Sequence, residues 1–204
     1  MSAARPFRLR AVLFDFDGTL THPGALDFAA IKRAVGCPPD QFVLEWILAL
    51  PPGAARDTAT LALERFELEA ADASAPNEGA EDLVRWLRGH GVAVGVLTRN
   101  GLGAVERALR RFAALTVDDF DVVVTRDDEH VAPKPAPDGV LHAAAAMGVD
   151  PEETLVVGDF LLDMRAGRAA GAVTAFLVNH GEPGAGEAAV PEAADCDFVV
   201  GRLG

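Results

Sequence analysis

Short uninterrupted apolar runs that alternate with helix-period segments constrain the fold of this chain more than any other feature. Runs of this length, each ended by turn or polar residues, fit strands that are buried on both faces of a sheet. Because helical segments separate them, the pattern predicts right-handed βαβ units and a doubly wound parallel sheet, an α/β fold. The runs lie at Ala11–Phe14, Val92–Leu97, Val122–Val124, Leu155–Val157, Val173–Val178 and Phe198–Val200, with helical segments at Ala80–Arg88, Leu102–Phe112, Pro137–Met147 and Leu161–Ala170.

One long stretch interrupts this alternation. From Thr21 to about Glu78, some 58 residues show helical periodicity only, punctuated by Pro38-Pro39 and Pro51-Pro52-Gly53. This is too long for one crossover connection, so we expect residues 21–78 to form an inserted all-helical domain. Residues 1–20 and 79–204 then form the sheet domain. The larger apolar side chains of the insert are expected to pack into its own core, and these are Phe28, Ile31, Phe42, Trp46, Leu61 and Phe66.

Composition excludes several classes of protein. The 204 residues carry 31 acidic and 18 basic side chains, a formal net charge of −13, and no cluster of basic residues, which argues against a nucleic-acid partner. The two cysteines, Cys37 and Cys196, have no metal-site or disulfide-scaffold spacing. Asp15 interrupts the first apolar run too early for a signal peptide or a membrane span, so we expect a cytoplasmic protein with no membrane partner. Monomer and dimer both remain open.

Two carboxylates directly follow the first apolar run. Asp15 and Asp17 stand two apart at the carboxyl end of the first predicted strand, where open α/β sheets bind their ligands. Their repulsion, roughly 4 kcal/mol at about 4 Å, requires a divalent cation or a shared proton. Oxygen ligands without His or Cys favour Mg²⁺. Asp17-Gly18 is alternatively a hairpin turn, but Thr21 to Gly24 do not begin a returning strand.

The second and third predicted strands are followed by groups suited to an anion. Thr98 offers a hydroxyl at a strand end, and the backbone amides of Arg99 and Asn100 stand beside a helix N-terminus, unless Asn100 is an ordinary helix cap. Lys134 lies between prolines that restrict the backbone and help to aim its ammonium at a phosphoryl group. A solvated surface lysine is the alternative, but the chain uses lysine only twice among its 18 basic residues.

The fourth apolar run ends in a second acidic pair. Asp159 can reach a cation held by Asp15, and Asp163, one helical turn further on, can support it from behind. Aspartate in a first helical turn also interacts favourably with the helix dipole alone, so the pair by itself does not establish a metal site.

Together, the four motifs resemble those of the haloacid dehalogenase superfamily of hydrolases. Their order and their placement at successive strand ends match over nearly the whole chain. The insert resembles the small C1-type helical cap of the phosphoglycolate phosphatase and β-phosphoglucomutase relatives, and the resemblance implies a Rossmann-like catalytic core. The motifs are Asp15-x-Asp17-Gly18-Thr19-Leu20, Thr98, Lys134-Pro135-x-Pro137-Asp138 and Gly158-Asp159-x-x-x-Asp163.

The resemblance implies a role for each motif. Asp15 would attack phosphorus and form an aspartyl phosphate, while Asp17 would protonate the leaving group and then activate water. Thr98 and Lys134 would hold the phosphoryl oxygens, together with Gly18, Arg99 and Asn100. The cofactor Mg²⁺ would be bound by Asp15, the backbone carbonyl of Asp17, Asp159 and Asp163.

Two positions bear on which activity within this superfamily we expect. Phe160 stands where relatives often have Ser, which alters the polar surroundings of the metal, whereas Asp17 is generally missing in the dehalogenases proper. The leading hypothesis is therefore a Mg²⁺-dependent phosphatase that acts on a small phosphorylated metabolite. A β-phosphoglucomutase-like phosphotransferase is the alternative. A phosphoaspartate receiver is a third, and the long helical insert counts against it.

Substrate choice is expected to lie in the insert and the loops that face it. Arg56 can meet a substrate carboxylate or second phosphate, and His22 follows the first motif, although a solvated arginine and a loop histidine are the simpler interpretations. Arg165 and Arg168 are assigned to the outer face of a helix.

Overall fold

The core of the protein is a parallel sheet of six strands. A computed structural model describes residues 8–179 and 195–204, and its strands are arranged in the order β3-β2-β1-β4-β5-β6. This is the order of a doubly wound Rossmann-like sheet, so the predicted fold class is confirmed. The strands are β1 (Ala11–Phe14), β2 (Ala93–Leu97), β3 (Val122–Val124), β4 (Thr154–Gly158), β5 (Val173–Leu177) and β6 (Phe198–Val200).

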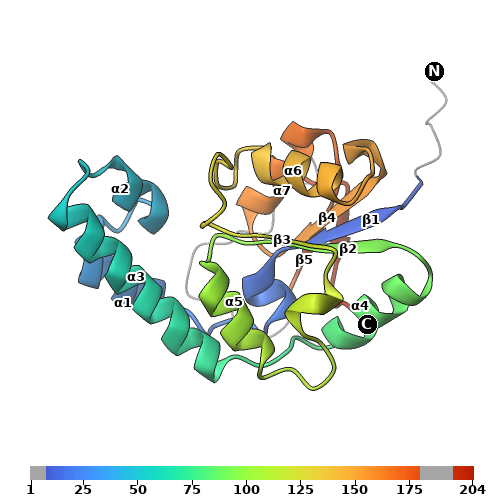
Figure 1. Cartoon of the computed structure of the whole chain (residues 1–204), viewed down its shortest axis with the longest axis horizontal. Coiled ribbons are helices and arrows are strands. Elements are labelled where there is room, and N and C mark those ends of the chain that lie inside the picture. Colours follow the sequence, from blue (N-terminus) through green and yellow to red (C-terminus); the bar gives the residue numbers. More distant parts are fainter. Residues whose placement is uncertain (1–7, 180–194) are drawn as a thin grey trace.

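Helices cover both faces of this sheet (Figure 1). Val12 and Phe14 pack with the apolar faces of α4 and α5, whereas Leu13 points to the opposite face and packs with α6 and α7. The alternation follows from the two-residue period of an extended strand. These helices are α4 (Ala80–Gly89), α5 (Leu102–Leu109), α6 (Asp138–Ala146) and α7 (Leu161–Ala170), and short 3₁₀ turns precede β3 and β4 at Val117–Asp119 and Pro151–Glu153.

All six predicted strands are present, within two residues at each end. The predicted helix Leu102–Phe112 ends earlier, at Leu109, and the hairpin alternative at Asp17-Gly18 is wrong. Every neighbouring strand runs parallel, and Gly18 instead takes a positive φ of 75° in a tight turn, Phe16–Leu20, that leads into the insert. The sequence between β5 and β6, which is rich in Gly, Pro and Ala, lies largely outside the described residues.

The insert consists of three helices with an apolar cluster of their own. Ile31, Leu44 and Ile47 are buried in it, with Trp46 and Phe66 packed against its edge. The expectation that all the large apolar side chains of the insert join this cluster is wrong for three of them, because they face outward from the helix bundle: Phe28, Phe42 and Leu61 are 46%, 48% and 65% exposed. The helices are α1 (Phe28–Val35), α2 (Val43–Ala49) and α3 (Ala54–Ala73).

Helix α3 connects the insert with the sheet domain. Its first half belongs to the insert cluster through Ala59 and Leu63, whereas Ala71 near its end is buried in the main core. Figure 1 shows the helix running from α2 down to α5. The two segments that connect the insert with the sheet domain pair with each other through an isolated antiparallel bridge between Thr21 and Pro76. The insert is therefore attached at one end by a continuous helix.

The topology places the ligand-binding edge of the sheet beside β1. The chain builds β2 and β3 on one side of β1 and then crosses to β4 on the other, so the carboxyl ends of β1 and β4 flank a topological switch point. The polar residues that follow β1, β2 and β4 meet at this edge. Among the described residues, no helix is long and apolar enough to cross a membrane.

Candidate active site

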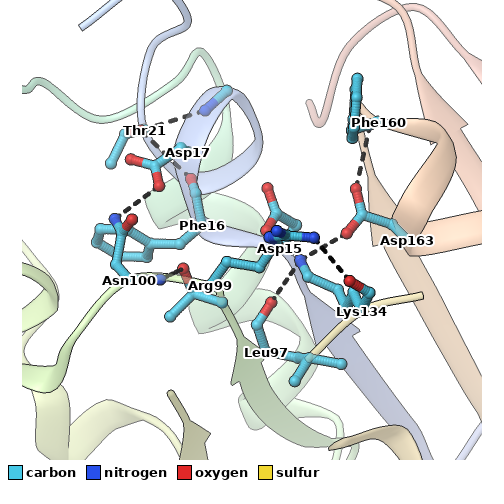
Figure 2. Close-up of polar contacts among 12 residues, drawn as sticks. Asp15, Phe16, Asp17, Thr21, Leu97, Arg99, Asn100, Lys134, Phe160 and Asp163 are labelled. Atoms are coloured by element: carbon cyan, nitrogen blue, oxygen red, sulfur yellow. Dashed lines mark hydrogen bonds and ion pairs between the residues drawn. The ribbon is translucent and has the colours of Figure 1, made fainter. Parts of the chain in front are cut away.

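Lys134 is the central cation of the polar cluster at this edge (Figure 2). Its Nζ atom lies 2.5 Å from Oδ1 of Asp15 and 2.6 Å from Oδ1 of Asp163. It also donates to the carbonyl of Leu97, at 2.9 Å, so its position is set by the ends of β1 and β2 and by the first turn of α7. Burial alone lowers the pKa of Lys134, but the charges of the two carboxylates overcome this and hold it above its usual value. The lysine therefore stays charged.

Three carboxylates, two of which contact this ammonium, lie close enough together to share a metal ion. One oxygen from each of Asp15, Asp159 and Asp163 lies within 4.8 Å of the other two. Burial, followed by the charges of Asp15 and Asp163, raises the pKa of Asp159 well above its usual range. Burial also raises the pKa of Asp163, against the lowering effect of Lys134. One ammonium does not neutralise three carboxylates, and a donor set made only of hard oxygens fits Mg²⁺.

The carboxylate of Asp17 has a different partner from that of Asp15. Its Oδ2 accepts a hydrogen bond of 2.6 Å from the side-chain amide of Asn100. Burial and the nearby charge of Asp15 raise the pKa of Asp17 to about 7, although the Asn100 hydrogen bond acts in the opposite direction. A carboxyl group with this pKa exchanges a proton near neutrality, as a general acid and base must. The side chains of Asp15 and Asp17 thus have separate chemical environments.

The loop that carries Gly18 is fixed against Asp159 by two asparagines. Asn179 donates to the carbonyl of Gly18 at 2.7 Å and to Oδ2 of Asp159 at 3.3 Å. Asn77 donates to the carbonyl of Thr19 at 3.0 Å and to Oδ1 of Asn179 at 3.1 Å. Neither asparagine was expected at the site. Asn179 follows β5 closely, so the rule that polar residues at strand ends converge would have found it, whereas no local pattern marks Asn77.

Thr98 lines a small cavity between the sheet edge and the insert. The cavity has a volume of about 130 Å³, and its wall includes Thr98 and Lys134 from the core and Leu44 and Leu48 from α2. The Thr98 hydroxyl accepts a hydrogen bond of 3.1 Å from the backbone amide of Asn100, which keeps the oxygen at the strand end. The remaining lining residues are Leu97, Val124, Thr125, Arg126, Val131, Ala132 and Pro133.

Comparison with known proteins agrees with this arrangement of residues. A family model described as haloacid dehalogenase-like hydrolase matches residues 9–171. The chain belongs to the haloacid dehalogenase-like hydrolases. It is 36% identical over 173 residues to an uncharacterized hydrolase of Saccharomyces cerevisiae, which covers 84% of this chain and 78% of the relative. It is 32% identical over 222 aligned positions to phosphoglycolate phosphatase 1 of Pseudomonas aeruginosa, covering 92% and 79%.

A solved structure has the same fold. CbbY from Rhodobacter sphaeroides, solved in complex with phosphate, superposes with a TM-score of 0.71 at 24% identity and covers 96% of this chain and 95% of its own. As a haloacid dehalogenase-like hydrolase, the chain is an enzyme, and the receiver alternative is set aside by the family match over residues 9–171.

Phe160, the departure noted within the fourth motif of this hydrolase, contacts the insert. Its ring meets that of Phe42 edge to face, with centroids 6.0 Å apart and planes at 88°. Its backbone amide donates to Oδ2 of Asp163 at 3.1 Å. The exposed Phe42 therefore has a role that the amphipathic pattern of the insert did not reveal, because it lies at the boundary with the core instead of inside the helix bundle.

Two further ion pairs join the end of α3 to the sheet domain. Arg126 binds Glu67 through both terminal nitrogens, at 2.5 and 3.0 Å, and both side chains are nearly buried. Glu67 also accepts from the backbone amide of Gly101 at 3.4 Å. Arg107 binds both oxygens of Asp72 at 2.5 Å on the surface. These contacts hold α3 on the loops that follow β2 and β3.

The remaining predicted residues lie apart from the carboxylates. Arg56 is half-buried in the first turn of α3, and no hydrogen bond or ion pair among the described residues joins it to the acidic cluster. His22 is exposed, with Nδ1 3.0 Å from the carbonyl of Pro23. Arg165 and Arg168 are exposed on α7, as expected. The Arg99 side chain, which was expected to contribute only its backbone amide, reaches both Lys134 and the insert.

Proposed function

We propose that this hydrolase is a Mg²⁺-dependent phosphatase that cleaves small phosphorylated metabolites through an aspartyl phosphate on Asp15. The observation that carries the proposal is the pairing of Asp15 with the ammonium of Lys134, inside a three-carboxylate cluster at the switch point of the sheet. The similarity to phosphoglycolate phosphatase 1 supports phosphate-ester chemistry, and the small volume of the adjoining cavity supports a small leaving group.

The first step is carried by Asp15. One of its carboxylate oxygens forms a bond to phosphorus while the bond from phosphorus to the ester oxygen breaks. Lys134, which contacts Asp15, and Thr98 would hold the phosphoryl oxygens. A Mg²⁺ ion held by Asp15, Asp159 and Asp163 would supply neutralisation of the phosphoryl charge. Catalysis then consists largely of positioning and charge stabilisation.

Asp17 would transfer a proton in each of the two steps of the reaction. With a pKa of about 7, it can donate its proton to the departing alkoxide and then accept one from the water that attacks the aspartyl phosphate. The second attack releases inorganic phosphate and restores Asp15 as a carboxylate. The Asn100 hydrogen bond gives the Asp17 carboxylate a partner other than the Lys134 ammonium that binds Asp15.

The three helices of residues 21–78 would act as a cap over this site. Leu44 and Leu48 of α2 form part of the cavity wall, and Phe42 contacts Phe160 beside the acidic cluster. These contacts restrict water and shape the space for the leaving group. We assign substrate selection to α2 and the loop before it.

The test is phosphate release from p-nitrophenyl phosphate and from a panel of metabolite phosphates, in Mg²⁺ and in chelator. We expect metal-dependent release by the wild type and a loss of about a thousandfold or more in Asp15→Asn. Asp57→Asn, at an exposed aspartate of α3, is the matched control and should retain activity. Full activity in chelator or in Asp15→Asn would show the proposal to be wrong. Conversion of a sugar 1-phosphate to the 6-phosphate without free phosphate would favour the phosphotransferase instead.

A further inference from the structure

The cavity at the sheet edge lies between the proposed phosphoryl ligands and the insert. Thr98 and Lys134 form part of its wall, and so do Leu44 and Leu48, which are one turn apart on α2. Leu97 and Lys134 lie next to each other there, joined by the hydrogen bond from Nζ to the Leu97 carbonyl (Figure 2). A phosphoryl group held by Thr98 and Lys134 would therefore lie beside this cavity, which leaves room there for its leaving group.

Most of the cavity wall is aliphatic. The larger apolar side chains on it are Leu44, Leu48, Leu97, Val124 and Val131. Leu97 and Val124 belong to the apolar cluster on one face of the sheet, with Val131 packed against them, whereas Leu44 belongs to the apolar cluster of the insert. The cavity is thus bounded by apolar clusters of both parts of the chain.

Two polar side chains on the wall already have their hydrogen-bond partners. The terminal nitrogens of Arg126 donate to both carboxylate oxygens of Glu67. The hydroxyl of Thr125 donates to Oδ2 of Asp128 at 3.1 Å and accepts from the backbone amide of Asp127 at 3.2 Å. Neither the guanidinium fork of Arg126 nor the hydroxyl of Thr125 is free to bind a leaving group.

The other two polar side chains on the wall are the proposed phosphoryl ligands themselves. The ammonium of Lys134 donates to two carboxylates and one carbonyl, which accounts for its three protons. The Thr98 hydroxyl accepts from the amide of Asn100 and retains its own proton for a phosphoryl oxygen. Within the part of the chain that the structure describes, no side chain on the wall therefore has a hydrogen bond left for a leaving group.

This distribution of partners favours an alkyl group over a polar one. A hydroxyl or ether oxygen that entered the cavity would lose its hydrogen bonds to water without gaining others, whereas each methylene would gain from leaving water. The volume sets an upper limit on size. An apolar cavity of roughly 150 Å³ holds one benzene molecule, so the observed volume of about 130 Å³ suits a chain of about four or five carbons.

We infer that the natural substrate is the monophosphate of a short aliphatic alcohol, whose alkyl group occupies this cavity between α2 and the sheet edge. The inference rests on the proposed phosphatase function and specifies its substrate class. Leu48 from the insert and Val131 from the core would be residues that determine this specificity, because both contribute aliphatic side chains to the wall.

The test compares n-butyl phosphate with 2-methoxyethyl phosphate, in which an ether oxygen replaces one methylene. The measured quantity is the ratio of their kcat/KM values, which cancels losses common to both substrates. We expect a ratio of about tenfold in favour of butyl phosphate for the wild type. The ether-containing alkoxide is the better leaving group, so chemical reactivity would not produce this preference. From ethyl to butyl phosphate, kcat/KM should rise about three- to fourfold per methylene.

Two variants change the polarity of the wall from opposite sides. Leu48→Ser shortens a side chain that is 43% exposed, and Val131→Thr keeps the shape but adds a hydroxyl that can donate to the ether oxygen. Each should lower the ratio about three- to tenfold. The matched control is Leu61→Ser, at a leucine that faces outward from α3, and it should leave the ratio unchanged.

A wild-type ratio of one or below would overturn the inference. So would a ratio that neither Leu48→Ser nor Val131→Thr lowers, or one that Leu61→Ser lowers as much as they do. Should Leu48→Ser fail to fold, as judged by circular dichroism, the Val131→Thr result decides. Absence of phosphate release from p-nitrophenyl phosphate would instead refute the phosphatase function itself.

Discussion

Replacing Gly18 with alanine distinguishes effects on the proposed metal site from effects on the fold more clearly than replacing any of the proposed ligands. Gly18 has a φ of +75°, and a Cβ atom on it would lie 2.8 Å from Cγ of Asp159 and closer still to Oδ2. Ordinary contacts begin at about 3.4 Å, so the carboxylate must withdraw by roughly 0.6 to 1.3 Å. The Asp159 carboxylate is the end of a side chain and can move. The substitution should therefore displace this carboxylate more than it destabilises the fold.

The expected magnitudes follow from these two effects. An alanine in the left-handed region loses about 1–2 kcal/mol of stability, which lowers Tm by roughly 2–8 °C for a chain of this size. Mg²⁺ requires near-ideal geometry, and ligand distances tolerate only about 0.2 Å. A displacement several times larger should raise the Mg²⁺ concentration for half-maximal activity by about 10- to 100-fold.

Gly36→Ala is the matched control. Gly36 has nearly the same backbone conformation, with φ +71°, at the end of α1, but a Cβ atom there meets nothing within 4 Å. Both variants should lose similar stability in thermal melts, and only Gly18→Ala should need more Mg²⁺ in titrations of phosphatase activity. Equal Mg²⁺ requirements for Gly18→Ala and the wild type would refute the role of Asp159 as a metal ligand packed against the first motif.

Three further predictions concern charge. Because the pKa of Asp17 is raised to about 7, its carboxyl keeps the proton below that pH and loses it above. Therefore kcat for ethyl phosphate should fall about tenfold per pH unit above neutrality, with a flatter profile for p-nitrophenyl phosphate. Arg126→Met leaves Glu67 buried without its partner and should cost about 3–5 kcal/mol in urea unfolding, and a loss under 1 kcal/mol would contradict the buried pair. Mg²⁺ should raise the Tm of the wild type but not of Asp159→Asn, because the cation relieves the repulsion between Asp159 and Asp15.

The sequence alone was sufficient to predict the sheet and the edge of the sheet at which the candidate site lies. Apolar runs at strand length, separated by helical segments, leave few arrangements other than a parallel sheet, and all six runs became strands. The carboxyl ends of parallel strands meet at one edge, so the residues that follow β1 and β4 had to meet there. Asp15, Asp159 and Asp163 could therefore be placed together from local pattern alone.

The direction of each side chain at that edge depended on contacts between distant parts of the chain. Asp17 faces Asn100, 83 residues later, and Arg99 faces Glu45, 54 residues earlier. Such pairings are set by how the insert docks on the core and by the turn at Gly18. Neither leaves a periodic signal in the sequence.

In the insert too, some features follow from the sequence pattern and others only from tertiary packing. Its helical character and its separate apolar cluster follow from the 3.6-residue period at which its apolar residues recur. The rotation of α2, which turns Leu44 inward and directs Glu45 towards the site, follows only from packing against α3 and the core. The preceding loop likewise brings Phe42 to Phe160. The amino-acid pattern thus determined which elements form and which candidate catalytic groups share an edge of the sheet. Tertiary packing decided which insert residues face those groups, because that choice depends on contacts between segments that no local pattern encodes.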